Sequence, residues 1–199
     1  MCIRDSRDTQ QEFFGVDAEY SYSNTDSEAF QTMGMAFSLH GGYKTNLTNS
    51  NRTFGFVIPS LSFDYKLIPN GRLVLATKFK GHFNLGNDFE FYQAASIGAN
   101  NGLRGFRFQR FTGKTAYFQN TDLRLSFRKR KTGLLPITPG IFTGFDYGRV
   151  WLPNTESNTW HNSYGGGFFI NGSDIISANL GVFNSTDGFR FTFGLGFGF

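Results

Sequence analysis

The last eleven residues alternate strictly between large apolar side chains and small or polar ones, and this pattern constrains the fold more than any other. Apolar side chains occupy the odd positions Phe189, Phe191, Phe193, Leu195, Phe197 and Phe199. The even positions hold arginine, threonine and three glycines. Because successive side chains of a β-strand point to opposite faces, the pattern predicts a strand with one apolar face. A strand of a soluble β-sandwich also alternates, but it does not usually need so much phenylalanine beside three glycines.

The same two-residue period recurs upstream, and there the polar face carries charge. Leu73, Leu75 and Phe79 alternate with Lys78 and Lys80, for example. A lysine or arginine facing the middle of a membrane costs about 2–4 kcal/mol, so these cations belong on a wet face. We therefore expect about nine strands, near residues 12–23, 29–44, 53–67, 71–85, 115–128, 138–151, 160–171, 174–184 and 189–199.

The composition fits strands that have one apolar and one wet face. The chain has 26 Phe and 25 Gly in 199 residues, yet its mean hydropathy is −0.30. No stretch reaches the roughly 18–20 apolar residues of a membrane-spanning helix, whereas a barrel strand needs only about 9–11 alternating residues. Long and short connections largely alternate, as in outer-membrane barrels. The prediction is an all-β, antiparallel transmembrane β-barrel.

The strand count also predicts how the chain is organised. Single-chain bacterial barrels have an even number of strands, so about nine strands indicate the C-terminal portion of a larger barrel. We assign residues 12–199 to this portion, including a long connection at 86–114 that is expected to fold into the lumen. Residues 1–11 show no periodicity and no signal-peptide layout, and are expected to be a non-native or disordered leader.

Several other functions find no support in the sequence. The net charge is only +4, and the basic residues look scattered, which speaks against nucleic-acid binding. His40, His82 and His161 lie on separate strands without the spacing of metal ligands. No phosphate-binding loop or nucleophile elbow occurs. We expect no metal, no cofactor and no enzymatic activity in this chain.

Three short motifs stand in order along the second half of the chain. The 86–114 connection contains Gly102-Leu103-Arg104-Gly105-Phe106, and an arginine flanked by glycines suits a tight turn that pushes one cation into a confined space. A solvated basic loop has the same pattern and remains an alternative. The second motif is Asn120-Thr121-Asp122, and the third is the strand segment 145–151, Phe-Asp-Tyr-Gly-Arg-Val-Trp.

With these motifs and its terminal aromatic residue, the chain resembles the BamA/TamA superfamily of outer-membrane assembly and translocation barrels, also called bacterial surface antigen proteins. The resemblance covers roughly residues 12–199 and implies a 16-stranded barrel whose sixth extracellular loop folds back into the lumen. It implies that Arg104, with Gly105 and Phe106, forms the tip of that loop and that Asp122 and Asp146 are its partners. The strand parity agrees, since both aspartates fall on the polar side of their strands. Phe197 and Phe199 match the C-terminal signal that the barrel-assembly machinery reads.

The function that the resemblance implies is assembly or insertion of outer-membrane proteins, or translocation of polypeptide. The expected partners are outer-membrane lipid, unfolded outer-membrane or secreted polypeptides, and the barrel-assembly machinery during biogenesis. The family's first and last strands meet at a weak seam, and residues 189–199 would form one side of it. Two alternatives stay open: a passive porin-like channel, and a barrel that exports or anchors a fused N-terminal enzyme domain such as a phosphoesterase or a patatin-like lipase.

Overall fold

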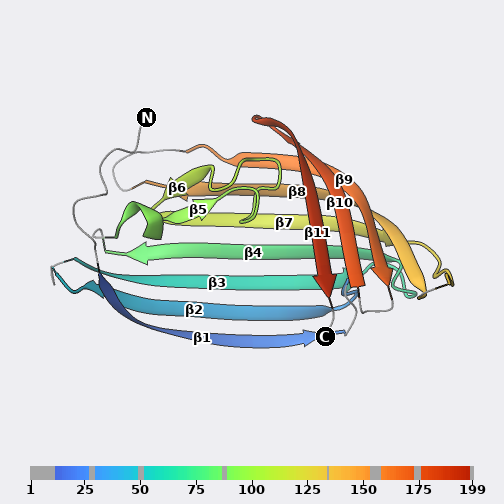
Figure 1. The fold of residues 1–199 in the computed structure, drawn as a ribbon, viewed down its shortest axis with the longest axis horizontal. Helices are drawn as coiled ribbons and strands as arrows, with labels where there is room; N and C mark the ends of the chain where they lie inside the picture. Colours follow the sequence, from blue (N-terminus) through green and yellow to red (C-terminus); the bar gives the residue numbers. More distant parts are fainter. Residues whose placement is uncertain are drawn as a thin grey trace.

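Nine long strands form one antiparallel sheet in which every strand pairs with its neighbours along the chain (Figure 1). The computed structural model describes residues 12–26, 30–48, 52–86, 89–133, 135–152, 158–172 and 176–197. The sheet strands are β1 (Phe13–Thr25), β2 (Gly34–Asn46), β3 (Thr53–Lys66), β4 (Leu73–Leu85), β7 (Thr115–Ser126), β8 (Ile137–Trp151), β9 (His161–Gly172), β10 (Ile176–Ser185) and β11 (Gly188–Phe197). The predicted all-β antiparallel fold with nine strands is confirmed, and every strand except β2 begins within two residues of its expected start.

The sheet curves strongly, and it is open in the described part of the chain. Figure 1 shows β1 to β8 lying side by side along the long axis, while β9, β10 and β11 turn steeply across that direction. Strands β1 and β11 are the two edges and do not pair with each other. Among the described residues, no helix is long and apolar enough to cross a membrane.

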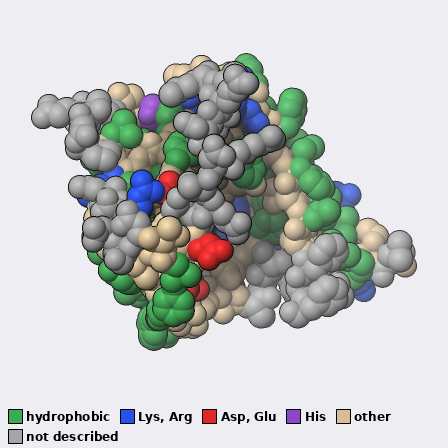
Figure 2. Space-filling view, turned by 60° about the vertical axis from the view of Figure 1, so that its left-hand side comes forward, with side chains coloured by type: hydrophobic (Ala, Val, Ile, Leu, Met, Phe, Trp, Pro, Cys, Tyr) green, Lys and Arg blue, Asp and Glu red, His purple; other side chains and the backbone are tan. Residues whose placement is uncertain are grey.

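One face of the sheet exposes large hydrophobic side chains on every strand, and we call it the apolar face. Phe145 on β8 is 48% exposed and Phe193 on β11 is 69% exposed. The row continues across the sheet through Tyr20, Leu39, Phe63, Leu75, Leu123, Phe168 and Leu180. In Figure 2, hydrophobic side chains lie along much of the margin of the molecule. The apolar side chains of the alternating strands are therefore not buried within this chain. They lie on its surface.

The opposite face carries the 86–114 connection, and we call it the loop face. Within the connection, β5 (Ala95–Ile97) and β6 (Phe111–Gly113) form a small antiparallel hairpin, preceded by the 3-10 helix η1 (Phe91–Gln93). The hairpin contacts β4, β7 and β8. Its side chains form the main buried apolar cluster with the sheet: Ala95, Ile97, Leu103, Phe106, Ala116, Phe118 and Val150. The core thus lies between the connection and the sheet.

The β1–β2 connection differs from the expectation of a short turn at residues 24–28. The carboxylate of Asp26 accepts hydrogen bonds from the backbone N–H groups of Thr32 at 3.0 Å and Met33 at 3.2 Å, so β2 begins only at Gly34. The neighbouring residues reach across the loop face. Arg124 of β7 donates to the Gln31 carbonyl at 2.7 Å, and the Phe30 ring lies 4.5 Å from that of Phe169 on β9. Four strands separate β2 from β9 in the sheet, so Phe30 and Gln31 reach across the curved interior.

Candidate functional site: the Arg104 cluster

The backbone around Arg104 is a tight turn that only its glycines permit. Leu103 N–H donates to the Gly98 carbonyl at 2.9 Å, and Phe106 N–H donates to the Leu103 carbonyl at 3.1 Å. Gly102 has a φ of 103°, and a Cβ there would lie 2.2 Å from the ring of Phe118. This combination of positive φ and close packing requires glycine.

Two buried apolar side chains anchor the turn on either side of the arginine. Leu103 and Phe106 are fully buried in the cluster against β7 and β8. Phe106 packs edge-on against Phe111 with ring centroids 5.1 Å apart. Because these two residues fix the turn on the sheet, the side chain of Arg104 is held over the loop face.

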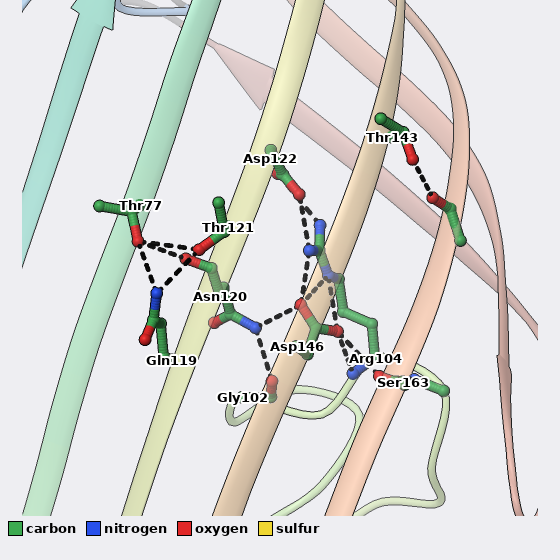
Figure 3. Close-up of polar contacts among 12 residues, drawn as sticks. Thr77, Gly102, Arg104, Gln119, Asn120, Thr121, Asp122, Thr143, Asp146 and Ser163 are labelled. Atoms are coloured by element: carbon green, nitrogen blue, oxygen red, sulfur yellow. Dashed lines mark hydrogen bonds and ion pairs between the residues drawn. The ribbon is translucent and has the colours of Figure 1, made fainter.

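The guanidinium of Arg104 lies between two carboxylates on neighbouring strands (Figure 3). Its Nε and Nη2 donate to Asp146 Oδ1 of β8 at 3.0 and 2.6 Å. Its Nη1 and Nη2 donate to Asp122 Oδ2 and Oδ1 of β7 at 3.1 and 2.6 Å. The backbone N–H of Arg104 also donates to Asp146 Oδ2 at 3.0 Å. Paired, charge-assisted hydrogen bonds of this kind are strong and specific in geometry.

The cluster is largely withdrawn from solvent. The side chain of Asp146 is 0% exposed, and those of Arg104 and Asp122 are 20% and 25% exposed. Burial alone would lower the pKa of the Arg104 guanidinium, but the hydrogen bonds and charges of Asp146 and Asp122 outweigh it and raise that pKa. The ring of Phe183 on β10 covers the guanidinium at 4.2 Å, as in a cation–π contact. Arg104 therefore stays charged, and its charge is matched on the sheet.

Further hydrogen bonds connect the turn to four strands. Asp146 also accepts from Asn120 Nδ2 at 2.7 Å and from Ser163 Oγ at 3.0 Å. Asn120 Nδ2 donates to the Gly102 carbonyl at 2.5 Å, and Ser185 Oγ donates to the Gly105 carbonyl at 2.6 Å. The turn is thereby bonded to β7, β8, β9 and β10.

The strand register explains why these side chains meet. Asn120, Asp146 and Ser163 are direct partners across β7, β8 and β9. In the adjacent row, Asp122 is opposite Gly144, and a Cβ at Gly144 would lie 2.6 Å from Arg104 Nη2. The bare position at Gly144 thus leaves the space that the guanidinium fills.

The structure brings Arg104, Asp122 and Asp146 together and places the other predicted residues around or apart from them. Gly105 adjoins the cluster, and its N–H donates to Ser163 Oγ at 3.2 Å. Phe106 belongs to the apolar cluster. Of the two expected signal residues, Phe197 ends β11, away from the Arg104 cluster, and Phe199 lies outside the described residues.

Sequence reasoning named Asn120 in the second motif without giving it a contact, and it missed three contributors: Ser163, Phe183 and Ser185. Asn120 had a usable signal, because it is two residues from Asp122 and so shares its face. The other three come from β9 and β10, and their meeting depends on a register that the sequence does not display.

The arrangement binds the connection to the sheet through one cation and two carboxylates. Both carboxylates are engaged by one cation, and the described residues contain no group of three or more His, Cys, Asp or Glu that could hold a metal. A cavity of about 320 Å³ adjoins the cluster, lined in part by Gln31, Asp64, Lys78, Arg104 and Asp122. The site thus fixes a loop beside a polar space.

Comparison with known proteins adds no assignment. No family model matches this chain, and no curated protein sequence matches it. Membership of the BamA/TamA superfamily therefore stays a prediction from the three motifs.

Proposed function

We propose that this chain forms the C-terminal part of a bacterial outer-membrane β-barrel of the BamA/TamA type, which inserts outer-membrane proteins or translocates polypeptide. The apolar face supports a membrane location, because exposed hydrophobic side chains run across all nine strands. In such a barrel, lipid would contact the apolar face and the loop face would line the lumen.

The observation that carries the proposal is the Arg104 cluster. A long connection lies on the face that would line the lumen, and one buried ion cluster fixes it there. This is the arrangement that the motif resemblance implies for the sixth extracellular loop. We propose that the cluster latches the loop inside the barrel and that the latched loop is needed for handling polypeptide. A passive channel has no such requirement.

The test compares two arginines of the same connection in the full-length protein. Arg104→Ala removes the buried cation, whereas Arg107→Ala removes an exposed one. We expect both variants to insert in the outer membrane, with lower steady-state levels of other outer-membrane proteins in Arg104→Ala only. Full activity in Arg104→Ala, with the loop in its normal place, would contradict the latch.

Depletion of the intact protein separates the functional classes. Loss of other outer-membrane proteins supports assembly, and loss of a secreted polypeptide supports translocation. If the levels of both stay unchanged while solute uptake falls, the protein is a passive channel. The exported or anchored enzyme domain has no support in the described residues, and the upstream coding sequence decides whether one is present.

A further inference from the structure

Six of the 19 lysines and arginines gather at one end of the sheet: Lys66, Arg72, Arg128, Lys129, Arg130 and Lys131. We call this group the basic rim. It lies where β3 and β7 end and β4 and β8 begin. Strand pairing brings the two segments together, and the Ser126 N–H donates to the Arg72 carbonyl at 2.7 Å. The interpretation that the basic residues are scattered is therefore wrong at this end of the sheet.

The cations of the basic rim have no acidic partners in the described part of the chain. The ion pairs of the described residues all involve other cations. Their acidic partners are Asp17, Asp64, Glu90, Asp122, Asp146 and Asp187. Asp26 and Asp64 line a neighbouring cavity that Lys66 also lines, but the Asp26 carboxylate accepts hydrogen bonds from the backbone and hydroxyl of Thr32, and Asp64 pairs with Arg124. Among the described residues, no carboxylate forms an ion pair with the cations of the basic rim.

A cavity of about 340 Å³ opens among these side chains. Among the described residues, four cations line it, namely Lys66, Arg72, Arg128 and Lys129, and no acidic residue does. The remaining polar lining includes the hydroxyls of Ser126 and Thr138 and the side chain of Asn70. The Oδ1 of Asn70 accepts from the Arg72 N–H at 3.0 Å, so its NH₂ group is the end left to donate. A set of cations, hydroxyls and one amide NH₂ matches the oxygens of a phosphate group.

The cavity also lies beside exposed apolar side chains. Tyr65, Leu67 and Phe127 are among the exposed hydrophobic residues and flank the cations in sequence. The β7–β8 ladder continues through Phe127, whose N–H donates to the Pro139 carbonyl at 2.8 Å, and through Arg130, which pairs with Ile137. Between these two pairings, residues 127–130 contain one residue more than residues 137–139, so a bulge interrupts the strict alternation of side chains, and the basic rim lies at this end of the sheet. A ligand that combines phosphate with acyl chains fits this boundary.

We propose that the basic rim binds the phosphate headgroup of an anionic phospholipid, with the acyl chains along the apolar face. The proposal rests on the membrane location given above. Clustered lysines and arginines at a membrane boundary attract anionic lipid in this way. The ligand docks at the end of the sheet opposite the long 86–114 connection, where β11 ends, which is the periplasmic end in a barrel of the proposed kind.

The test counts lipids bound to the full-length protein in non-ionic detergent by native mass spectrometry. The probes are phosphatidylglycerol, phosphatidylcholine and inorganic phosphate. One variant, Arg72→Gln with Arg128→Gln, removes two cations that line the cavity. The matched control, Arg130→Gln with Lys131→Gln, removes two cations of the same rim that do not line it. Each cation near an anionic surface contributes about a factor of five, so the first variant should bind phosphatidylglycerol about thirtyfold more weakly.

Selective binding of phosphatidylglycerol that the first variant loses and the control keeps supports the site. An equal loss in both variants overturns it, because only diffuse charge attraction would remain. Binding of inorganic phosphate without preference for phosphatidylglycerol overturns the lipid assignment and leaves a free-phosphate site. If the protein inserts in membranes but shows no lipid selectivity, only the lipid site is contradicted. If the protein does not enter membranes, the proposed function is contradicted as well.

Discussion

Replacing Asp146 by asparagine tests the latch most directly, because it removes one charge at nearly constant shape. Asp146 is fully buried and accepts from five donors: Arg104 N, Nε and Nη2, Asn120 Nδ2 and Ser163 Oγ. Breaking a buried ion pair from one side costs about 3–5 kcal/mol. Arg104 would still pair with Asp122, so we expect the docking of the turn to lose about 3 kcal/mol, the lower end of this range.

Asp122→Asn should cost less than Asp146→Asn. Asp122 is 25% exposed, and its carboxylate contacts the sheet-bound turn only through Arg104 Nη1 and Nη2. Water can partly replace these contacts, so we expect a cost of about 1–2 kcal/mol. The structure therefore predicts that Asp146→Asn weakens the docking of the turn on the sheet more than Asp122→Asn does.

Hydrogen exchange of residues 98–106 in the full-length protein measures this cost, because it reports the free energy of local opening. Asp146→Asn should speed exchange about a hundredfold and Asp122→Asn about tenfold. Asp187→Asn is the control, since it removes a carboxylate that pairs at 2.8 Å with Arg110, an exposed residue of the same connection. Its effect should be the smallest of the three. Equal protection in all variants, or a larger effect of Asp122→Asn, would refute the reasoning.

Three further predictions address the turn, the apolar face and the β1–β2 connection. Gly105→Ala adds a Cβ that would lie 2.6 Å from the Cβ of Ser163, so the melting temperature should fall, corresponding to a loss of about 1–3 kcal/mol in stability. The control Gly133→Ala adds a Cβ with nothing within 4 Å and should leave the melting temperature unchanged. Phe145→Arg should lower the yield of membrane-inserted protein, by about 2–4 kcal/mol of insertion free energy, whereas Phe91→Arg in the 86–114 connection should not. Equal yields would place the apolar face away from lipid. Arg124→Gln removes the contact with the Gln31 carbonyl, so proteolysis within residues 26–33 should accelerate; an unchanged cleavage rate would show that this contact does not hold the connection.

Most of the sheet was predictable from the two-residue period. Strands such as β11 alternate so clearly that both the element and its faces follow from the residue order. The boundaries of β2 did not follow, because the Asp26 side chain bonds two backbone N–H groups and delays the strand to Gly34. The hairpin of β5 and β6 was not predicted, since strands of three residues are too short to display a period.

The residues of the site also include some that the sequence predicts and some that it does not. The motifs and strand parity lead to Arg104, Asp122 and Asp146, which are joined in the structure. Ser163 and Phe183 could not be predicted, because their contacts depend on how β9 and β10 are aligned with β8. Alignment between strands is a property of the folded sheet and leaves no mark on any single strand.

The bonding of one turn to four strands has a consequence for how the sheet is assembled. Side chains change face at every residue, so a one-residue slip between β7 and β8 would carry Asp122 or Asp146 away from Arg104. A slip of β9 would remove Ser163 from the same cluster. The turn can therefore dock only on a correctly aligned sheet. The contacts around this one arginine select the correct register of four strands.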